Sequence, residues 1–350
     1  MAGQSLRPIT MTGHHDPEDL ITVPVRSSAS AGSSGTISGA GEFTVIEAVT
    51  AGREQPATTV LGPGDDAAVV TAPDGRMVAS VDMLVDGVHF RSDWASGEQI
   101  GSRAAMASMA DIAAMGARPT ALLVAVSAPG GTPMATVTGI GDGLHAAAEQ
   151  AGAGVVGGDL ASSSVLAISV TALGDLGGAD PVLRSGARPG DQLALVGRIG
   201  WAAAGLAVLT RGFRSPAAVV SAYRVPEPPL AQGPRAAAAG ATAMIDVSDG
   251  LLADLGHICR ASGVSIDVRS SSLEVPGRLT EVASALGKNA LTWLLTGGDD
   301  HPLVATFPAG SMLPPGWLTI GTVADGSGVT VDGSSYDGDP GWDHFRAARP

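Results

Sequence analysis

Hydrophobic and polar positions follow no regular spacing in the first 40 residues of the chain. Residues 1–40 are rich in Ser, Gly, Thr and Pro, a composition typical of a disordered tail. Helical spacing begins near Gly41, where Phe43, Ile46 and Val49 recur on one face. We therefore expect ordered structure to start near Gly41.

From Gly41 to residue 176, strand-like and helix-like patterns alternate. Ser96 is expected to cap a helix that ends near Gly116, and a second helix is expected from about Pro133 to Gln150. Shorter apolar runs predict strands, at Thr58–Leu61, Ala67–Thr71, Met77–Val85, Thr120–Ala128, Val155–Val156 and Leu166–Leu173.

A Gly- and Asp-rich stretch, 174–180, is typical of a linker and separates two expected domains, 41–176 and 180–350. The second half shows helical patterns at Gly200–Thr210, Asp249–Ala261 and Thr280–Leu286. Its other apolar runs are Leu193–Val196, Ala243–Val247, Val264–Val268, Leu291–Leu295, Leu303–Phe307 and Leu318–Val323. Strands outnumber helices and short turns often separate them, which favours an α+β fold over a doubly wound sheet.

Composition narrows the class of function. The chain has 34 acidic and 20 basic residues, and Lys288 is its only lysine. A net charge of −14 disfavours nucleic acid and anionic membranes as partners. The single cysteine, Cys259, rules out an intrachain disulfide, and no apolar run approaches a membrane span. Without a signal-peptide pattern, we expect a cytoplasmic protein.

Six short segments bring Asp together with Gly, Ser or apolar residues. Any one of them is more often a turn than a ligand. Asp82, however, lies inside an apolar strand, where an unpaired carboxylate is costly. Asp111 falls in the last turn of its helix, where the dipole disfavours an anion by roughly 0.3–1 kcal/mol. The segments are Gly64–Asp66, Ser80–Asp82, Met109–Ile112, Gly157–Asp159, Asp246–Gly250 and Gly297–Asp300.

A divalent cation among these groups would remove both penalties, and carboxylate oxygens suit Mg²⁺ or Ca²⁺. Mg²⁺ commonly bridges phosphates, and phosphoryl transfer depends on such charge neutralisation. The turn at Ser248–Gly250 precedes a helix whose N-terminus can bind phosphate. Other motifs fail: Lys288 is followed by Asn289, so there is no Walker A loop, and no Ser lies in a GxSxG turn.

The order of these motifs resembles that of the thiamine-monophosphate kinase family, within a superfamily that includes aminoimidazole-ribotide synthetase and selenophosphate synthetase. The resemblance runs from Gly41 to Phe345 and is most specific at Ser80–Phe90, Asp111–Ala117, Arg184–Asp191 and Asp246–Leu251. It implies transfer of the γ-phosphoryl group of ATP to thiamine monophosphate without a phosphoenzyme, so no residue is expected to act as a covalent catalyst. It also implies a homodimer whose N-terminal sheets form a barrel, with a layered α/β C-terminal domain.

The resemblance also implies roles for particular residues. Several Mg²⁺ ions would be held by Asp66, Ser80, Val81 (through its carbonyl), Asp82, Asp111, Asp159, Asp246 and Asp249. The nucleotide would contact Gly158, Asp159, Arg184 and Ser248, and thiamine monophosphate would contact His89, Asp299 and Trp342.

The chain departs from the family pattern at two places. Asp299 stands where the family usually has Glu, and no aromatic residue near Gln150 and Ala151 could stack on adenine.

Two alternatives to the kinase stay open. One is another ATP-using enzyme of the superfamily, such as a ribotide or selenophosphate synthetase. The other is a non-catalytic protein that binds divalent cations, although its acids would then be expected to cluster locally.

Overall fold

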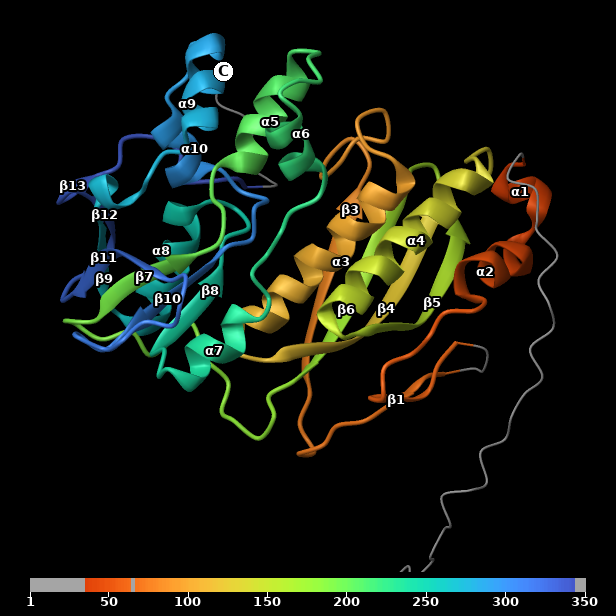
Figure 1. The fold of residues 1–350 in the computed structure, drawn as a ribbon, viewed down its shortest axis with the longest axis horizontal. Coiled ribbons are helices and arrows are strands. Elements are labelled where there is room, and N and C mark those ends of the chain that lie inside the picture. Colours follow the sequence, from red (N-terminus) through yellow and green to blue (C-terminus); the bar gives the residue numbers. More distant parts are fainter. Residues whose placement is uncertain (1–34, 64–66, 344–350) are drawn as a thin grey trace, which may run out of the picture. The chain divides into compact units, whose positions relative to one another are not determined.

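The computed structural model describes residues 35–63 and 67–343, and its course is shown in Figure 1. The predicted tail therefore lies almost wholly outside the described residues, as do Asp65 and Asp66. The first half contains α1 (Ile37–Ala40), α2 (Glu42–Thr50), β1 (Thr59–Leu61), β2 (Val69–Val70), β3 (Val78–Val85), α3 (Gly97–Ala114), β4 (Arg118–Ala128), α4 (Met134–Ala151), β5 (Gly154–Ser162) and β6 (Ala167–Asp175).

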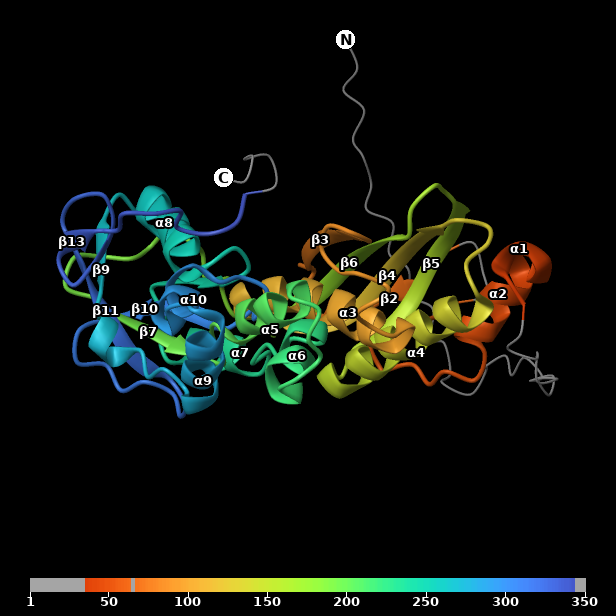
Figure 2. The ribbon, with the colours of Figure 1, turned by 90° about the horizontal axis from the view of Figure 1, so that it is seen from above.

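A four-stranded sheet in the order β3-β6-β4-β5 forms the centre of this half. Strands β4 and β5 are parallel, because α4 carries the chain back between them, and the other pairs are antiparallel. Figures 1 and 2 show α3 and α4 side by side on one face of the sheet. The opposite face exposes Val81, Met83 and Leu123.

Helices α3 and α4 pack with their backbones in close contact. A Cβ atom at Gly101 would lie 2.0 Å from the carbonyl oxygen of Ile140, and one at Gly143 would lie 1.9 Å from that of Glu98. Only glycine fits at such distances. Helix α3 begins at Ser96 with a capping box, in which Ser96 and Gln99 each cap the other's backbone N–H.

The second half forms a seven-stranded sheet in the order β13-β12-β9-β11-β7-β10-β8. Strands β7 and β10 are buried on both faces, which explains their largely apolar sequences. The elements are β7 (Gln192–Val196), α5 (Trp201–Thr210), α6 (Ala217–Arg224), α7 (Gln232–Ala238), β8 (Ala243–Asp246), α8 (Leu251–Ser262), β9 (Ser265–Val268), η1 (Ser270–Ser272), α9 (Gly277–Leu286), α10 (Ala290–Thr296), β10 (Leu303–Phe307), β11 (Leu318–Ala324), β12 (Gly328–Val331) and β13 (Ser334–Ser335).

The predicted α+β composition agrees with the structure, whose described residues form thirteen strands and ten α-helices. Three details differ from the sequence analysis. The apolar run at Leu291–Leu295 lies in helix α10, and a short helix, α1, precedes Gly41. In the two larger sheets, strands consecutive in the chain are seldom neighbours, so the expected short-turn pairing holds mainly for β1–β2 and β12–β13.

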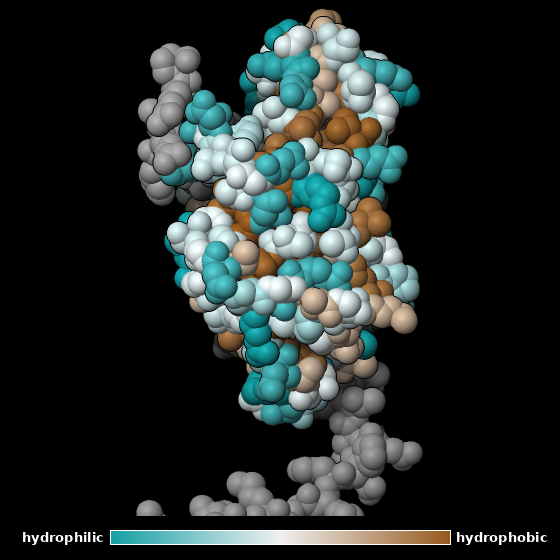
Figure 3. All heavy atoms as spheres, turned by 90° about the vertical axis from the view of Figure 1, so that its left-hand side faces the viewer, coloured by the Kyte–Doolittle hydropathy of each residue, from teal (hydrophilic) through white to brown (hydrophobic). Residues whose placement is uncertain are grey.

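The molecular surface reflects the polar composition of the loops. The face shown in Figure 3 is mostly hydrophilic, with small separate hydrophobic areas. Among the described residues, no helix combines the length and the hydrophobicity that crossing a bilayer requires.

Candidate functional site

Acidic side chains from β3 and α3 meet on the helix-covered side of the first sheet. The Oγ atom of Ser80, on β3, donates a hydrogen bond of 2.5 Å to Oδ2 of Asp111, in the last turn of α3. Burial, followed by the negative charges of Asp246 and Asp82, raises the pKa of Asp111 to about 6. Three carboxylates that the sequence analysis selected therefore influence one another electrostatically.

Asp246 ends strand β8 and forms a buried pair with His301. The two side chains are almost inaccessible, and Nδ1 of His301 lies 3.0 Å from Oδ2 of Asp246. Burial alone would lower the pKa of His301, but the hydrogen bond and the charge of Asp246 outweigh it and raise the pKa. The sequence analysis did not select His301, which follows the Gly297–Asp300 motif directly.

The turn between β8 and α8 is held by a second buried acid, Asp254. Its Oδ2 atom accepts the backbone N–H groups of Asp249 and Gly250, each at 3.1 Å. Burial, followed by the charge of Asp246, raises the pKa of Asp254 to about 7. The sequence analysis also missed this residue. The sequence did indicate that Asp254 is buried, because it lies on the same apolar helix face as Leu251, Leu255 and Ile258.

The Gly297–His301 segment crosses directly over this turn. The N–H of Asp299 donates to the carbonyl of Ser248 at 2.8 Å, and a Cβ at Gly298 would lie 2.2 Å from the same oxygen. Oδ2 of Asp299 forms an ion pair of 2.8 Å with the buried Arg103 of α3. Oδ1 of Asp300 accepts the N–H of Ala202 at the start of α5, and burial raises the pKa of Asp300 to about 7.

Other predicted site residues lie near this region without joining it. The Nδ1 atom of His89 accepts the N–H of Val85 at 3.0 Å. Trp342 is 59% exposed, and its N–H donates to the carbonyl of Asp249 at 2.9 Å. Arg184 is exposed, and its carbonyl accepts the hydroxyl of Ser262.

Gly158 and Asp159 occupy β5, which is separated from β3 by two intervening strands, β6 and β4, and so lies three strand spacings away. Neighbouring strands are about 4.8 Å apart, so about 14 Å separates these residues from β3. Val81 points to the opposite face from Asp82, as alternation along β3 requires. The structure thus brings together Ser80, Asp82, Asp111 and Asp246, and it leaves the β5 pair apart.

No group of three or more His, Cys, Asp or Glu side chains is already gathered as a metal site within the described ranges. The donor set nevertheless fits a hard cation. Asp111, Asp246 and Asp82 offer carboxylate oxygens and repel one another, and a cation would relieve that repulsion.

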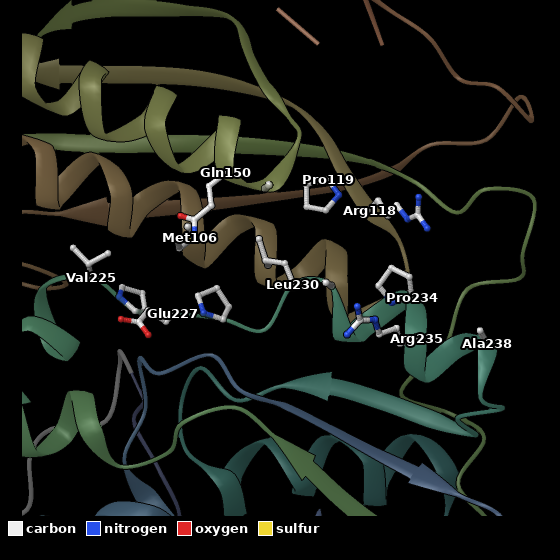
Figure 4. A pocket seen from close by; sticks show the side chains of 14 residues that line it. Met106, Arg118, Pro119, Gln150, Val225, Glu227, Leu230, Pro234, Arg235 and Ala238 are labelled. Carbon is white, nitrogen blue, oxygen red and sulfur yellow. The ribbon is translucent and has the colours of Figure 1, made fainter. Parts of the chain in front are cut away.

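A pocket of about 870 Å³ lies elsewhere, between the middle of α3, the end of α4, the start of β4, the segment 225–231 and helix α7 (Figure 4). Arg118 and Arg235 line it together with apolar side chains such as Met106 and Leu230. None of the predicted site residues lines it, so the acidic residues, and not this pocket, define the candidate site.

Comparison with known proteins identifies the family of this chain. Residues 64–176 match the family described as AIR synthase related protein, N-terminal domain. Thiamine-monophosphate kinase of Mycobacterium tuberculosis is 51% identical over 312 residues, which cover 89% of this chain and 93% of that protein. The chain belongs to the thiamine-monophosphate kinase family.

Solved structures of thiamine-monophosphate kinases show the same fold. The enzyme from Stenotrophomonas maltophilia is 34% identical, with a TM-score of 0.73 over 83% of this chain and 95% of that chain. A structure described as AaThiL complexed with AMPPCP and TMP is 29% identical, also with a TM-score of 0.73, and covers 88% of this chain and 98% of that one. The motif order in the sequence therefore predicted the thiamine-monophosphate kinase family correctly.

Proposed function

We propose that this protein transfers the γ-phosphoryl group of ATP to thiamine monophosphate, forming thiamine diphosphate and ADP. The observation that carries the proposal is the cluster of Ser80, Asp111, Asp246 and His301, in a chain 51% identical to a thiamine-monophosphate kinase. A related protein of similar fold has been solved with AMPPCP, an ATP analogue, and TMP. We place the enzyme in the cytoplasm.

Several Mg²⁺ ions would be held by the carboxylates around Asp111 and Asp246, with Asp66 added by its motif position. When bound, Mg²⁺ supplies positive charge to the phosphates. The chain itself is short of cations that could replace it, since Lys288 is its only lysine.

The protein's own groups then bind and orient the two substrates. The turn at Ser248–Gly250, whose Asp249 and Gly250 N–H groups are held by Asp254, precedes helix α8, and the N-terminus of that helix is the proposed phosphate site. Gly158 and Arg184 are proposed nucleotide contacts. His89, Asp299 and Trp342 are proposed contacts to thiamine monophosphate. In keeping with the family resemblance, we propose direct in-line transfer without a phosphoenzyme.

The active unit is proposed to be a homodimer, since Asp159 cannot reach the acids of its own chain. Both β3 and β5 are edge strands of the four-stranded sheet. Closing two such sheets into one barrel would pair β5 with β3 of a second copy. It would also bury the apolar face of Val81, Met83 and Leu123. Asp159, on β5, would then lie beside the second copy's β3, the strand that carries Ser80 and Asp82. This barrel, with 180–350 as a separate C-terminal domain, is the proposed layout.

The direct test is to incubate the purified protein with ATP, Mg²⁺ and thiamine monophosphate and to measure thiamine diphosphate and ADP. EDTA should abolish the reaction, and added Mg²⁺ should restore it. Asp246→Asn should be inactive, whereas Asp325→Asn, a matched change of an exposed carboxylate, should be fully active. Formation of no thiamine diphosphate by the wild-type protein would refute the proposed function.

The dimer has a separate test by mixing variants. Asp82→Asn and Asp159→Asn should each be inactive alone. Co-refolded in equal amounts, they should recover about a quarter of wild-type activity, because half of the dimers are mixed and each mixed dimer has one intact site. No recovery, in mixtures shown to exchange subunits, would mean that Asp159 does not serve the second copy's site.

A further inference from the structure

Helix α3 contains a buried arginine two turns before Asp111. Arg103 is only 4% exposed. Its NH2 atom pairs with Oδ2 of Asp299 at 2.8 Å, its NH1 atom donates to the carbonyl of Tyr223, and its guanidinium lies 5.0 Å from the centre of the Tyr223 ring. Because a buried guanidinium is costly without partners, this set of three contacts gives the side chain one fixed position.

Among the residues that the structure describes, Asp299 is the only charged partner of Arg103, and it remains open on its other side. Its side chain is 46% exposed, and its Oδ1 atom has no hydrogen-bond partner within the described part of the chain. The residue adopts a φ of 68°, a conformation that is unfavourable for residues other than glycine. Arg103 therefore holds the Oδ2 atom of Asp299 in place, and Oδ1 remains on the exposed side of the carboxylate.

A row of two aromatic rings, with an arginine at each end, extends from Arg103 to the segment that carries His89. The Tyr223 ring packs edge-on against Trp94 at 5.9 Å, and the guanidinium of Arg91 lies 4.4 Å from the centre of the Trp94 ring. Arg91 follows His89 by two positions. The packed array thus runs from Asp299 to Arg91, which lies close to His89 in the sequence.

We propose that Arg103 is a positioning residue that aims the free oxygen of Asp299 at the thiamine portion of the acceptor. Thiamine monophosphate carries a cationic ring and an aminopyrimidine N–H donor, and a fixed carboxylate oxygen suits both. The guanidinium of Arg103 binds both the backbone carbonyl of Tyr223 and the carboxylate of Asp299. It therefore holds Asp299, whose side chain is shorter than the Glu usual in the family, in one orientation. The inference deepens the proposed function and rests on it.

If Arg103 positions Asp299, replacing Arg103 should weaken the binding of thiamine monophosphate and not that of ATP. Arg103→Met keeps the volume and the apolar stem of the side chain but releases Asp299. The KM for thiamine monophosphate should rise about tenfold, while the KM for ATP should stay within about twofold. Arg103→Lys keeps the charge but loses the fork, so its KM should be intermediate.

The experiment measures steady-state kinetics and melting temperatures for wild type, Arg103→Met, Arg103→Lys, Asp299→Asn and the double variant Arg103→Met/Asp299→Asn. The double variant should be no worse for thiamine monophosphate than the more impaired single variant, because both changes disable the same oxygen. Arg278→Met is the control. It removes an exposed Arg–Glu pair on α9, 2.7 Å long, and should change neither KM.

Three results would overturn the positioning role while the wild type stays active. Equal rises in both KM values would indicate a general disturbance of the site. Effects of Arg103 and Asp299 that multiply in the double variant would show that they act independently. A lowered melting temperature with both KM values normal in Arg103→Lys would make Arg103 a structural residue. An inactive wild type would instead refute the proposed function.

Discussion

Replacing Asp111 with Asn should make the metal-free protein more stable while abolishing its activity. In the folded chain, Asp111 is largely buried and faces the charges of Asp246 and Asp82, so its ionised form is unfavourable. Asn has nearly the same shape, and its amide can still pair with the hydroxyl of Ser80. The substitution therefore removes a repulsive charge and leaves the packing in place.

The size of the effect follows from the pKa. Each unit of pKa shift corresponds to about 1.4 kcal/mol, so the rise of the Asp111 pKa from 3.8 to about 6 is equivalent to about 3 kcal/mol. A folded-state pKa above the unfolded value means that stability falls as pH rises from about 4 to 6. At pH 7.5 without metal, Asp111→Asn should be more stable by up to about 3 kcal/mol, and its melting temperature higher by up to about 6 °C.

Thermal melting in EDTA at pH 7.5 and pH 5 provides the assay. The gain should fall to about half at pH 5, where the folded wild type is already mostly protonated at this position. Adding Mg²⁺ should then raise the melting temperature of the wild type more than that of the variant. A variant less stable than wild type at pH 7.5, or a gain equal at both pH values, would refute the electrostatic reasoning.

Two further predictions concern Trp342, which contacts the turn at Asp249, and His145, which lies on helix α4 away from the described site. Trp342→Ala should raise the KM for thiamine monophosphate several-fold and leave the KM for ATP unchanged, since an exposed indole can stack on the thiamine rings. Its melting temperature should change little. Burial, and then the charge of Arg53, lower the pKa of His145 to about 4, so the folded state loses stability as pH falls from about 6.5 toward 4. His145→Gln should therefore lose less melting temperature than wild type between pH 7 and pH 5.

A definite experimental outcome would contradict each of the Trp342 and His145 predictions. A Trp342→Ala protein that melts far earlier, or that loses affinity for both substrates, would make Trp342 a structural anchor. Parallel melting curves for wild type and His145→Gln across the pH range would show that His145 does not contribute to the acid sensitivity.

Much of the local structure could be predicted from the sequence because its causes are local. The capping residue Ser96 and the terminating Gly116 marked the ends of α3, and an acid inside the apolar run of β3 marked Asp82. The order of strands could not be predicted. Alternation along a strand shows which side chains share a face, but not which strand lies beside it. The position of β6 between β3 and β4 is one example.

The same limit applied to the candidate site. Asp111 and Asp246 were identified because each stands in a recognisable motif. His301 and Arg103 were missed because their importance comes from partners distant in the sequence, Asp246 and Asp299 respectively. Nothing in the neighbourhood of Arg103 distinguishes it from an arginine on an exposed helix face.

The close contact between α3 and α4 has a consequence for how the enzyme tolerates change. Gly101 and Gly143 let one helix backbone rest directly on the other, so no flexible side chain lies between them to absorb an added methyl group. A Cβ at Gly143 would have to displace α3 along its whole length, and with it both Asp111 and Arg103. Because misplacing reacting groups by about 1 Å can lower a rate a hundredfold, an alanine at this remote glycine would behave as an active-site mutation.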